Sequence, residues 1–132
     1  MKRALIIVLL SVLCFGCNNE MRDVKAAAND YLMAVSLYDV EGAERYCTEE
    51  TKETTLDMAR FLLQYVDSSY LVSDKPVVID IISMKSTSDT TATVCYRKTT
   101  PVKDFADTLE MRKRDGKWLA HAPMVKNNAV AQ

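Results

Sequence analysis

The stretch that decides the fold is Arg114-Asp115-Gly116-Lys117-Trp118-Leu119. Asp-Gly is a strong signal for a two-residue turn between antiparallel strands, so this stretch predicts a β-hairpin. A two-residue turn also fixes the register of both strands. The register places Met111 and Trp118 on one face, which we expect the helices to cover, and it pairs Glu110 with His121 on the outer face.

Two more strands are predicted before this hairpin. Pro76 ends the helical part of the chain, and residues 77–85 are rich in β-branched side chains. A polar turn over residues 86–89 leads into residues 90–99, where apolar and polar side chains alternate. Residues 105–112 alternate in the same way. The four segments predict an antiparallel meander of four strands.

The register of the first hairpin follows from its predicted four-residue turn. Such a turn pairs Ile79 with Tyr96 and leaves Asp80 beside Cys95 on the outer face. Four residues are expected to form an apolar streak on that face: Val78, Ile82, Met84 and Leu119. A streak of this kind predicts a homodimer or a docked envelope protein.

The first half of the chain has helical periodicity. Apolar residues recur at helical spacing over residues 24–38, which Asp23 is placed to cap. Asp39 is placed to cap a short second helix over residues 40–47, and Thr48 opens a third helix that reaches Val66. We therefore predict an α+β fold with three N-terminal helices packed on a curved four-stranded antiparallel meander.

The N-terminus has the plan of a lipoprotein signal peptide. A positive pair at residues 2–3 precedes an apolar run over residues 4–15, and Gly16 stands directly before Cys17. The run is shorter than the roughly 20 residues that a membrane-spanning helix needs. We predict cleavage after Gly16 and a lipid on Cys17. The chain then divides as follows: signal peptide 1–16, lipidated tether 17–22, α+β domain 23–126 and polar tail 127–132.

Charge and cysteine content exclude several classes. Cleavage removes two of 17 basic residues and leaves 15 against 18 acidic ones, a net charge of −3, so no nucleic-acid partner is expected. Cys47 and Cys95 remain after cleavage, and their spacing fits no metal motif. The sequence does not decide whether they form a disulfide, because Cys95 is predicted on the outer face, away from the helices. No metal or cofactor is expected.

The order of helices and strands, with Asp39, Gly42 and Ala43 at a helix junction and Asp-Gly-Lys-Trp in the last hairpin, resembles the nuclear transport factor 2-like superfamily. More narrowly, the chain is similar to small lipoproteins of Bacteroides-like organisms that carry a domain of unknown function. The resemblance implies a curved sheet wrapped around the first helix as a cone with an apolar mouth. It also implies dimerisation through the outer face of the sheet.

The superfamily includes enzymes that resemble ketosteroid isomerase and scytalone dehydratase, which act on apolar ligands inside the cone. Asp107 shares the parity of the inward residues, so with Tyr31 or Tyr38 it is a candidate proton-transfer pair in a pocket that also holds Met111 and Trp118. The alternative is that Asp107 lies at a solvated strand end and that the aromatic residues are core.

Together these observations predict a membrane-anchored lipoprotein of the cell envelope, on the outer membrane or cell surface rather than the inner membrane. We expect a non-catalytic domain that binds an apolar small ligand or a protein partner. The alternative is a minimal lyase or isomerase. No motif in the sequence names the ligand.

Overall fold

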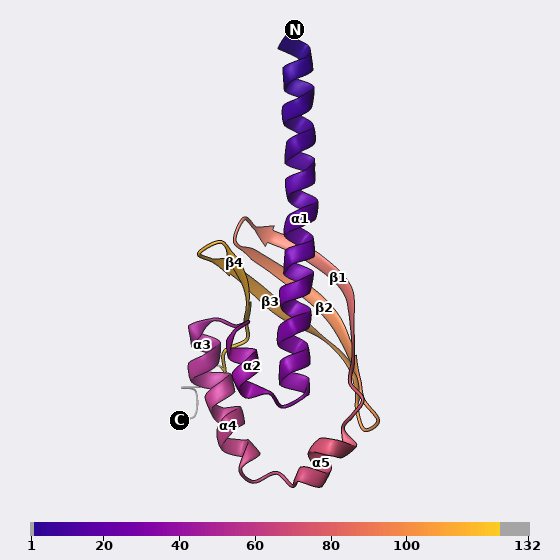
Figure 1. The fold of residues 1–132 in the computed structure, drawn as a ribbon, viewed down its shortest axis with the longest axis vertical. Coiled ribbons are helices and arrows are strands. Elements are labelled where there is room, and N and C mark those ends of the chain that lie inside the picture. Colours follow the sequence, from indigo (N-terminus) through magenta and orange to yellow (C-terminus); the bar gives the residue numbers. More distant parts are fainter. Residues whose placement is uncertain (1, 125–132) are drawn as a thin grey trace, which may run out of the picture.

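The computed structural model describes the backbone of residues 2–124 and the side chains of residues 19–124. Helices precede strands along the chain, as Figure 1 shows. The helical elements are α1 (Lys2–Ser36), α2 (Val40–Glu44), α3 (Glu49–Thr51), the π-helix η1 (Lys52–Leu56), α4 (Asp57–Leu63) and α5 (Ser68–Ser73). The strands are β1 (Val78–Ser88), β2 (Thr91–Thr99), β3 (Asp104–Arg114) and β4 (Lys117–His121).

The four strands form one antiparallel sheet in the order β1-β2-β3-β4, so each strand pairs with its neighbour in sequence. The sheet curves around the C-terminal half of α1 (Figure 1). Both the predicted meander and the α+β fold class are confirmed.

The register predicted for the last hairpin is confirmed. Lys113 pairs with Trp118, and Glu110 pairs with His121. The turn residues Asp115 and Gly116 have φ angles of 53° and 76°, as a turn of this type requires at both central positions. The short turn leaves no freedom to slip, so local sequence alone determines which side chains of this hairpin face inward.

The register predicted for the first hairpin is wrong. Ile79 pairs with Lys98 rather than Tyr96, because β1 continues to Ser88, which pairs with Thr91, so the turn has two residues instead of the predicted four. The pairing also shifts between Ile81 and Ser83. Such a bulge reverses the side-chain alternation beyond it. Met84 consequently packs against the core and does not belong to the outer streak. The other three members of the streak, all exposed or half-buried, are Val78, Ile82 and Leu119.

The two cysteines of the domain do not pair. Cys95 lies opposite Ser83 and Thr108 on the outer face, as predicted, whereas Cys47 is buried. Both thiols are free.

Helix α1 does not begin near Val24. Its backbone is helical from Lys2, so Asp23 lies inside the helix and does not cap it. Contacts of the preceding turn explain the difference: Met21 packs against the core, and Glu20 forms an ion pair with Lys113 at the end of β3. This ion pair lowers the pKa of Glu20. Sequence periodicity could not show either contact, because both depend on the sheet.

The end of α1 has the hydrogen bonds of a Schellman motif. The amide of Tyr38 donates to Val35 O at 3.1 Å, and the amide of Asp39 donates to Ala34 O at 2.9 Å. Tyr38 therefore occupies the position past the helix end that glycine usually fills, and its φ is +60°. A bulky side chain is unusual in this left-handed conformation.

Asp39 caps α2 as predicted. Its carboxylate accepts a hydrogen bond from the amide of Gly42 at 3.0 Å. A Cβ atom on Gly42 would lie 2.1 Å from Asp39 Oδ2, so the cap and the glycine depend on each other. The Asp-x-x-Gly pattern at the helix junction thus has a steric cause.

The third helix starts after Thr48, as predicted, and runs on through α3, η1 and α4. Just before it, Cys47 pairs in parallel with Ala120, and the amide of Thr48 donates to Ala120 O at 2.9 Å. The chain before α3 therefore covers the edge of β4. Helix α5, which the sequence pattern did not predict, begins after Asp67, whose side chain accepts from the Ser69 amide.

The core lies between α1 and the inner face of the sheet. It contains side chains from the stripe of α1, from η1 and from alternate residues of β2, β3 and β4, among them Val24, Tyr31, Leu32, Leu56, Val94, Leu109, Met111 and Trp118. Within residues 19–124, no helix is long and apolar enough to cross a membrane. The side chain of Cys17 lies outside the described residues, so the lipid attachment stays a prediction.

Candidate functional site

The five residues predicted to line a pocket occupy three different environments. Tyr31, Met111 and Trp118 are buried in the core. Asp107 is exposed on β3, where it lies opposite Tyr96 and three residues after the start of the strand. The hydroxyl of Tyr38 donates to a different carboxylate, that of Asp74. Tyr38 therefore does not pair with Asp107, and Tyr31, the other predicted partner, is part of the core.

Asp74, which the sequence did not single out, is a fully buried carboxylate. Its Oδ2 accepts a hydrogen bond from Tyr38 Oη at 2.7 Å, and its Oδ1 accepts one from Thr100 Oγ1 at 2.6 Å. Lys103 Nζ lies 3.8 Å from Oδ2. The hydroxyls of Thr100 and Tyr38, followed by the charge of Lys103, lower the pKa of Asp74. The carboxylate thus stays ionised and joins three distant segments.

Tyr38 also lines an apolar groove beside α4. The groove has a volume of about 260 Å³ and is formed by the end of α1, the start of α2, the end of η1, one face of α4 and the turn after α4. Seven aliphatic side chains complete its lining: Val35, Val40, Leu56, Ala59, Leu62, Leu63 and Val66. None of the lining residues carries a carboxylate, an imidazole or a thiol.

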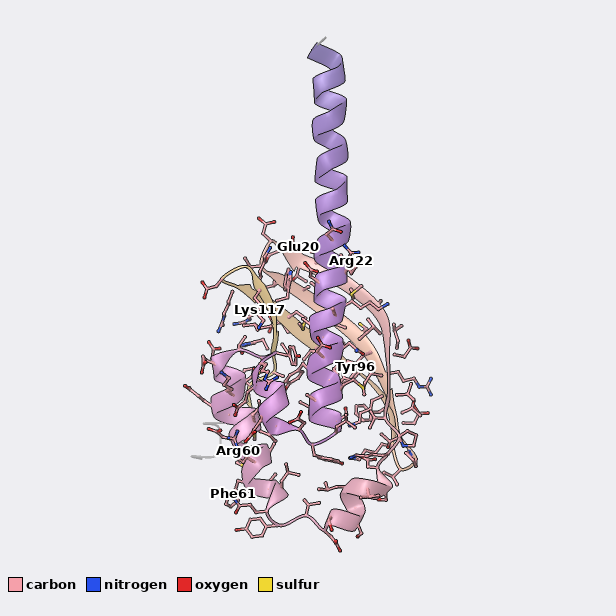
Figure 2. All side chains as sticks on the ribbon, viewed as in Figure 1. Glu20, Arg22, Arg60, Phe61, Tyr96 and Lys117 are labelled. Carbon is pink, nitrogen blue, oxygen red and sulfur yellow. The ribbon has the colours of Figure 1, made fainter. Side chains whose placement is uncertain are left out.

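Helix α4 and the turn after it also expose apolar side chains, and two of them, Phe61 and Tyr65, lie outside the groove lining. Phe61 and Tyr65 stack edge to face with their ring centroids 5.4 Å apart, and they are 52% and 74% exposed. Leu62 and Val66 extend the exposed apolar surface into the groove itself. Figure 2 shows Phe61 at the opposite end of the domain from Glu20 and Arg22. Clustered exposed aromatic and aliphatic side chains are typical of binding surfaces.

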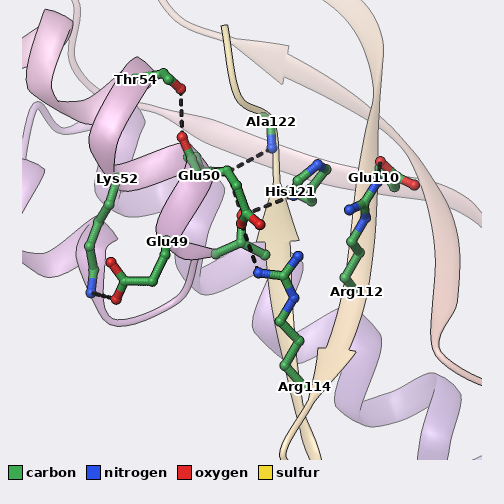
Figure 3. Close-up of polar contacts among 11 residues, drawn as sticks. Glu49, Glu50, Lys52, Thr54, Glu110, Arg112, Arg114, His121 and Ala122 are labelled. Carbon is green, nitrogen blue, oxygen red and sulfur yellow. Dashed lines mark hydrogen bonds and ion pairs between the residues drawn. The ribbon is translucent and has the colours of Figure 1, made fainter.

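His121, the only histidine, belongs to a polar network on the outer side of β4 (Figure 3). Its Nδ1 lies 2.9 Å from Thr48 Oγ1, which in turn lies 2.8 Å from Thr51 Oγ1. Burial of the imidazole, with a contribution from nearby Arg112, lowers the pKa of His121. The sequence predicted the pairing with Glu110 but not these hydroxyl partners.

This network fixes α3 against β4 rather than presenting a nucleophile. Thr48 and Thr51 are both buried, so no substrate reaches their hydroxyls. Thr51 Oγ1 also accepts a hydrogen bond from the amide of Ala122, and Arg114 pairs with Glu50 beside it (Figure 3). Among residues 19–124, no group of three or more histidine, cysteine or acidic side chains is placed to hold a metal ion.

Comparison with solved structures tests the predicted fold. The chain is similar to an NTF-2 like protein of unknown function from Shewanella oneidensis MR-1, with 18% sequence identity and a TM-score of 0.56. The match covers 80% of this chain and 99% of that chain. The predicted nuclear transport factor 2-like fold is therefore confirmed, and a fold alone does not specify an activity. No protein-family model and no curated protein matches the chain.

Proposed function

We propose that this protein is a lipid-anchored binding protein of the bacterial cell envelope that holds an apolar ligand in the groove between α1 and α4. The observation that carries the proposal is the groove itself, which is lined by Tyr38 and seven aliphatic side chains. Its volume of about 260 Å³ suits one hydrocarbon chain or a small ring system. Typical pockets for larger ligands begin at about 300 Å³.

The chemistry of the groove favours binding over catalysis. Proton-transfer enzymes need a positioned acid or base within hydrogen-bond reach of the substrate. The only ionisable group in the lining is the hydroxyl of Tyr38, which already donates to Asp74, and its pKa is raised to about 12 by burial and by that hydrogen bond. The groove therefore offers shape and apolar surface and no reactive group.

The place of the groove in the fold agrees with an anchor at Cys17. Figure 1 shows the N-terminal part of α1 at one end of the molecule and α4 and α5 at the other. At a rise of 1.5 Å per residue, Val35 lies about 27 Å along α1 from Cys17. A lipid on Cys17 would hold the groove away from the membrane surface, where it is accessible to a soluble ligand.

Binding of the neutral dye Nile red, followed by its fluorescence, tests the proposal. The core residues all follow Cys17, so residues 18–132 contain the whole described core and serve as the lipid-free protein. We expect saturable binding by the parent. Ala59→Phe places a ring in the groove and should weaken binding about tenfold or more, which corresponds to about 1.4 kcal/mol.

Met58→Phe is the matched control. Met58 precedes Ala59 on α4 but is exposed and does not line the groove, so this variant should bind like the parent. Equal binding by the parent and Ala59→Phe would contradict the proposal. Equal weakening by both variants would also contradict it, because the effect would then come from α4 as a whole and not from the groove.

A further inference from the structure

The conformation of Tyr38 conflicts with the local preference of the chain. Tyr38 occupies the left-handed position of a Schellman motif, where glycine has no steric penalty and a tyrosine does. A residue held in such a conformation persists only where surrounding contacts overdetermine it, and such residues cluster at functional sites. The side chain of Tyr38 must therefore have a use that a glycine could not supply.

The position of Asp74 conflicts with local preference as well. It caps the C-terminus of α5, the end of a helix that disfavours negative charge. It is also fully buried, and a buried carboxylate is costly unless hydrogen bonds and a countercharge satisfy it. Its partners, Tyr38, Thr100 and Lys103, all lie far from it in sequence. Tertiary contacts alone account for its presence here.

Both conflicts meet in one hydrogen bond, from Tyr38 Oη to Asp74 Oδ2 at 2.7 Å. The ring of Tyr38 lines the groove, whereas Asp74 does not. The bond restrains the side chain of Tyr38. Because the hydroxyl already donates to Asp74, it is not free to bind a polar group of the ligand. Tyr38 keeps its proton throughout the physiological range, because its pKa is about 12.

We infer that Asp74 is a positioning residue for the groove: its carboxylate holds the Tyr38 ring in place as a groove wall and so sets the affinity for an apolar ligand. The inference rests on the proposed function and goes beyond it, because it makes a buried group outside the groove a determinant of binding. Side chains that are fixed before binding lose less conformational entropy when the ligand arrives.

Tyr38→Phe tests this directly, because it keeps the ring and removes only the hydrogen bond. We expect Nile red binding to weaken about tenfold in this variant, although phenylalanine is the more apolar residue. Asp74→Asn should weaken binding as well. The double variant, Tyr38→Phe with Asp74→Asn, should bind Nile red about as tightly as whichever single variant binds it less tightly, since both changes break the same hydrogen bond.

Thr100→Val is the matched control for a general loss of stability. Thr100 donates to the other oxygen of Asp74 and does not line the groove, so this variant disturbs the same buried carboxylate and leaves the Tyr38 bond intact. We expect it to bind like the parent. If Thr100→Val weakens binding as much as Tyr38→Phe does, Asp74 is merely structural and the inference is wrong.

The outcomes separate the two proposals. If the parent binds Nile red and Ala59→Phe does not, but Tyr38→Phe binds as tightly as the parent or more tightly, the groove is a binding site and only the role of Asp74 is refuted. If the parent does not bind, both proposals fail. Should Asp74→Asn not fold, as judged by circular dichroism, Tyr38→Phe still decides the question.

Discussion

Trp118→Ala should cost about 3 to 5 kcal/mol of the free energy of unfolding, the usual range for truncation of a buried tryptophan. Trp118 is 5% exposed and lies on the inner face of β4. A buried aromatic ring removes about 150 to 250 Å² from water, worth about 4 to 6 kcal/mol at 25 cal/mol per Å² as an upper estimate. The buried Nε1 has no hydrogen-bond partner among the described residues, so apolar burial and the new cavity account for the loss.

Urea denaturation followed by circular dichroism measures this effect. Fluorescence cannot serve, because Trp118 is the only tryptophan in the chain. Trp118→Phe is the control, since it keeps an aromatic ring and removes the unsatisfied Nε1, and it should cost clearly less than the alanine variant. A loss below about 1 kcal/mol in Trp118→Ala would refute the reasoning, because a ring on the covered face cannot be removed so cheaply.

Three further predictions concern other parts of the molecule. Gly42→Ala should destabilise the domain by about 1 kcal/mol or more in urea, although alanine favours helix, because the new Cβ displaces the Asp39 cap; an unchanged midpoint would contradict this. The pKa of His121 is lowered in the folded state, so neutral His121 contributes stability above the unfolded pKa of about 6.5. This stability is lost as the pH falls through the folded pKa. The urea midpoint should fall less from pH 7.5 to 5 in His121→Gln than in the parent, and equal slopes would count against it. Cys17→Ser should abolish fatty-acid labelling and membrane retention of the full chain, and retained labelling would exclude this anchor.

The last hairpin and the helix junction show where local sequence is sufficient. Asp115 and Gly116 have the positive φ angles that fix a two-residue turn, so the faces of Met111 and Trp118 follow from the turn alone. Asp39 and Gly42 lie three residues apart and cap α2 through a contact within that span. The first hairpin was predicted with the wrong register, because its turn is shorter than the polar stretch 86–89 suggested and because the pairing shifts again between Ile81 and Ser83.

The candidate site belongs almost wholly to the tertiary structure. Sequence analysis named Tyr38 as a pocket residue, but it offered Tyr38 or Tyr31 as the partner of Asp107, which is exposed. The true partner, Asp74, stands in a polar connection between α5 and β1 that carries no motif. The groove likewise depends on where α1 and α4 lie on either side of it, which neither helical stripe specifies by itself.

The sequence by itself therefore determined the fold class, the meander of four strands and the register of the last hairpin, because each rests on interactions within a few residues or on composition. The tertiary structure decided the environment of Asp74, whose hydroxyl donors lie 36 and 26 residues away. It also decided the inward turn of Met84 and the free state of Cys47. Those features depend on which distant parts of the chain pack together. Hydrophobic periodicity reports only local secondary structure, so it does not show which distant side chains bury or neutralise one another.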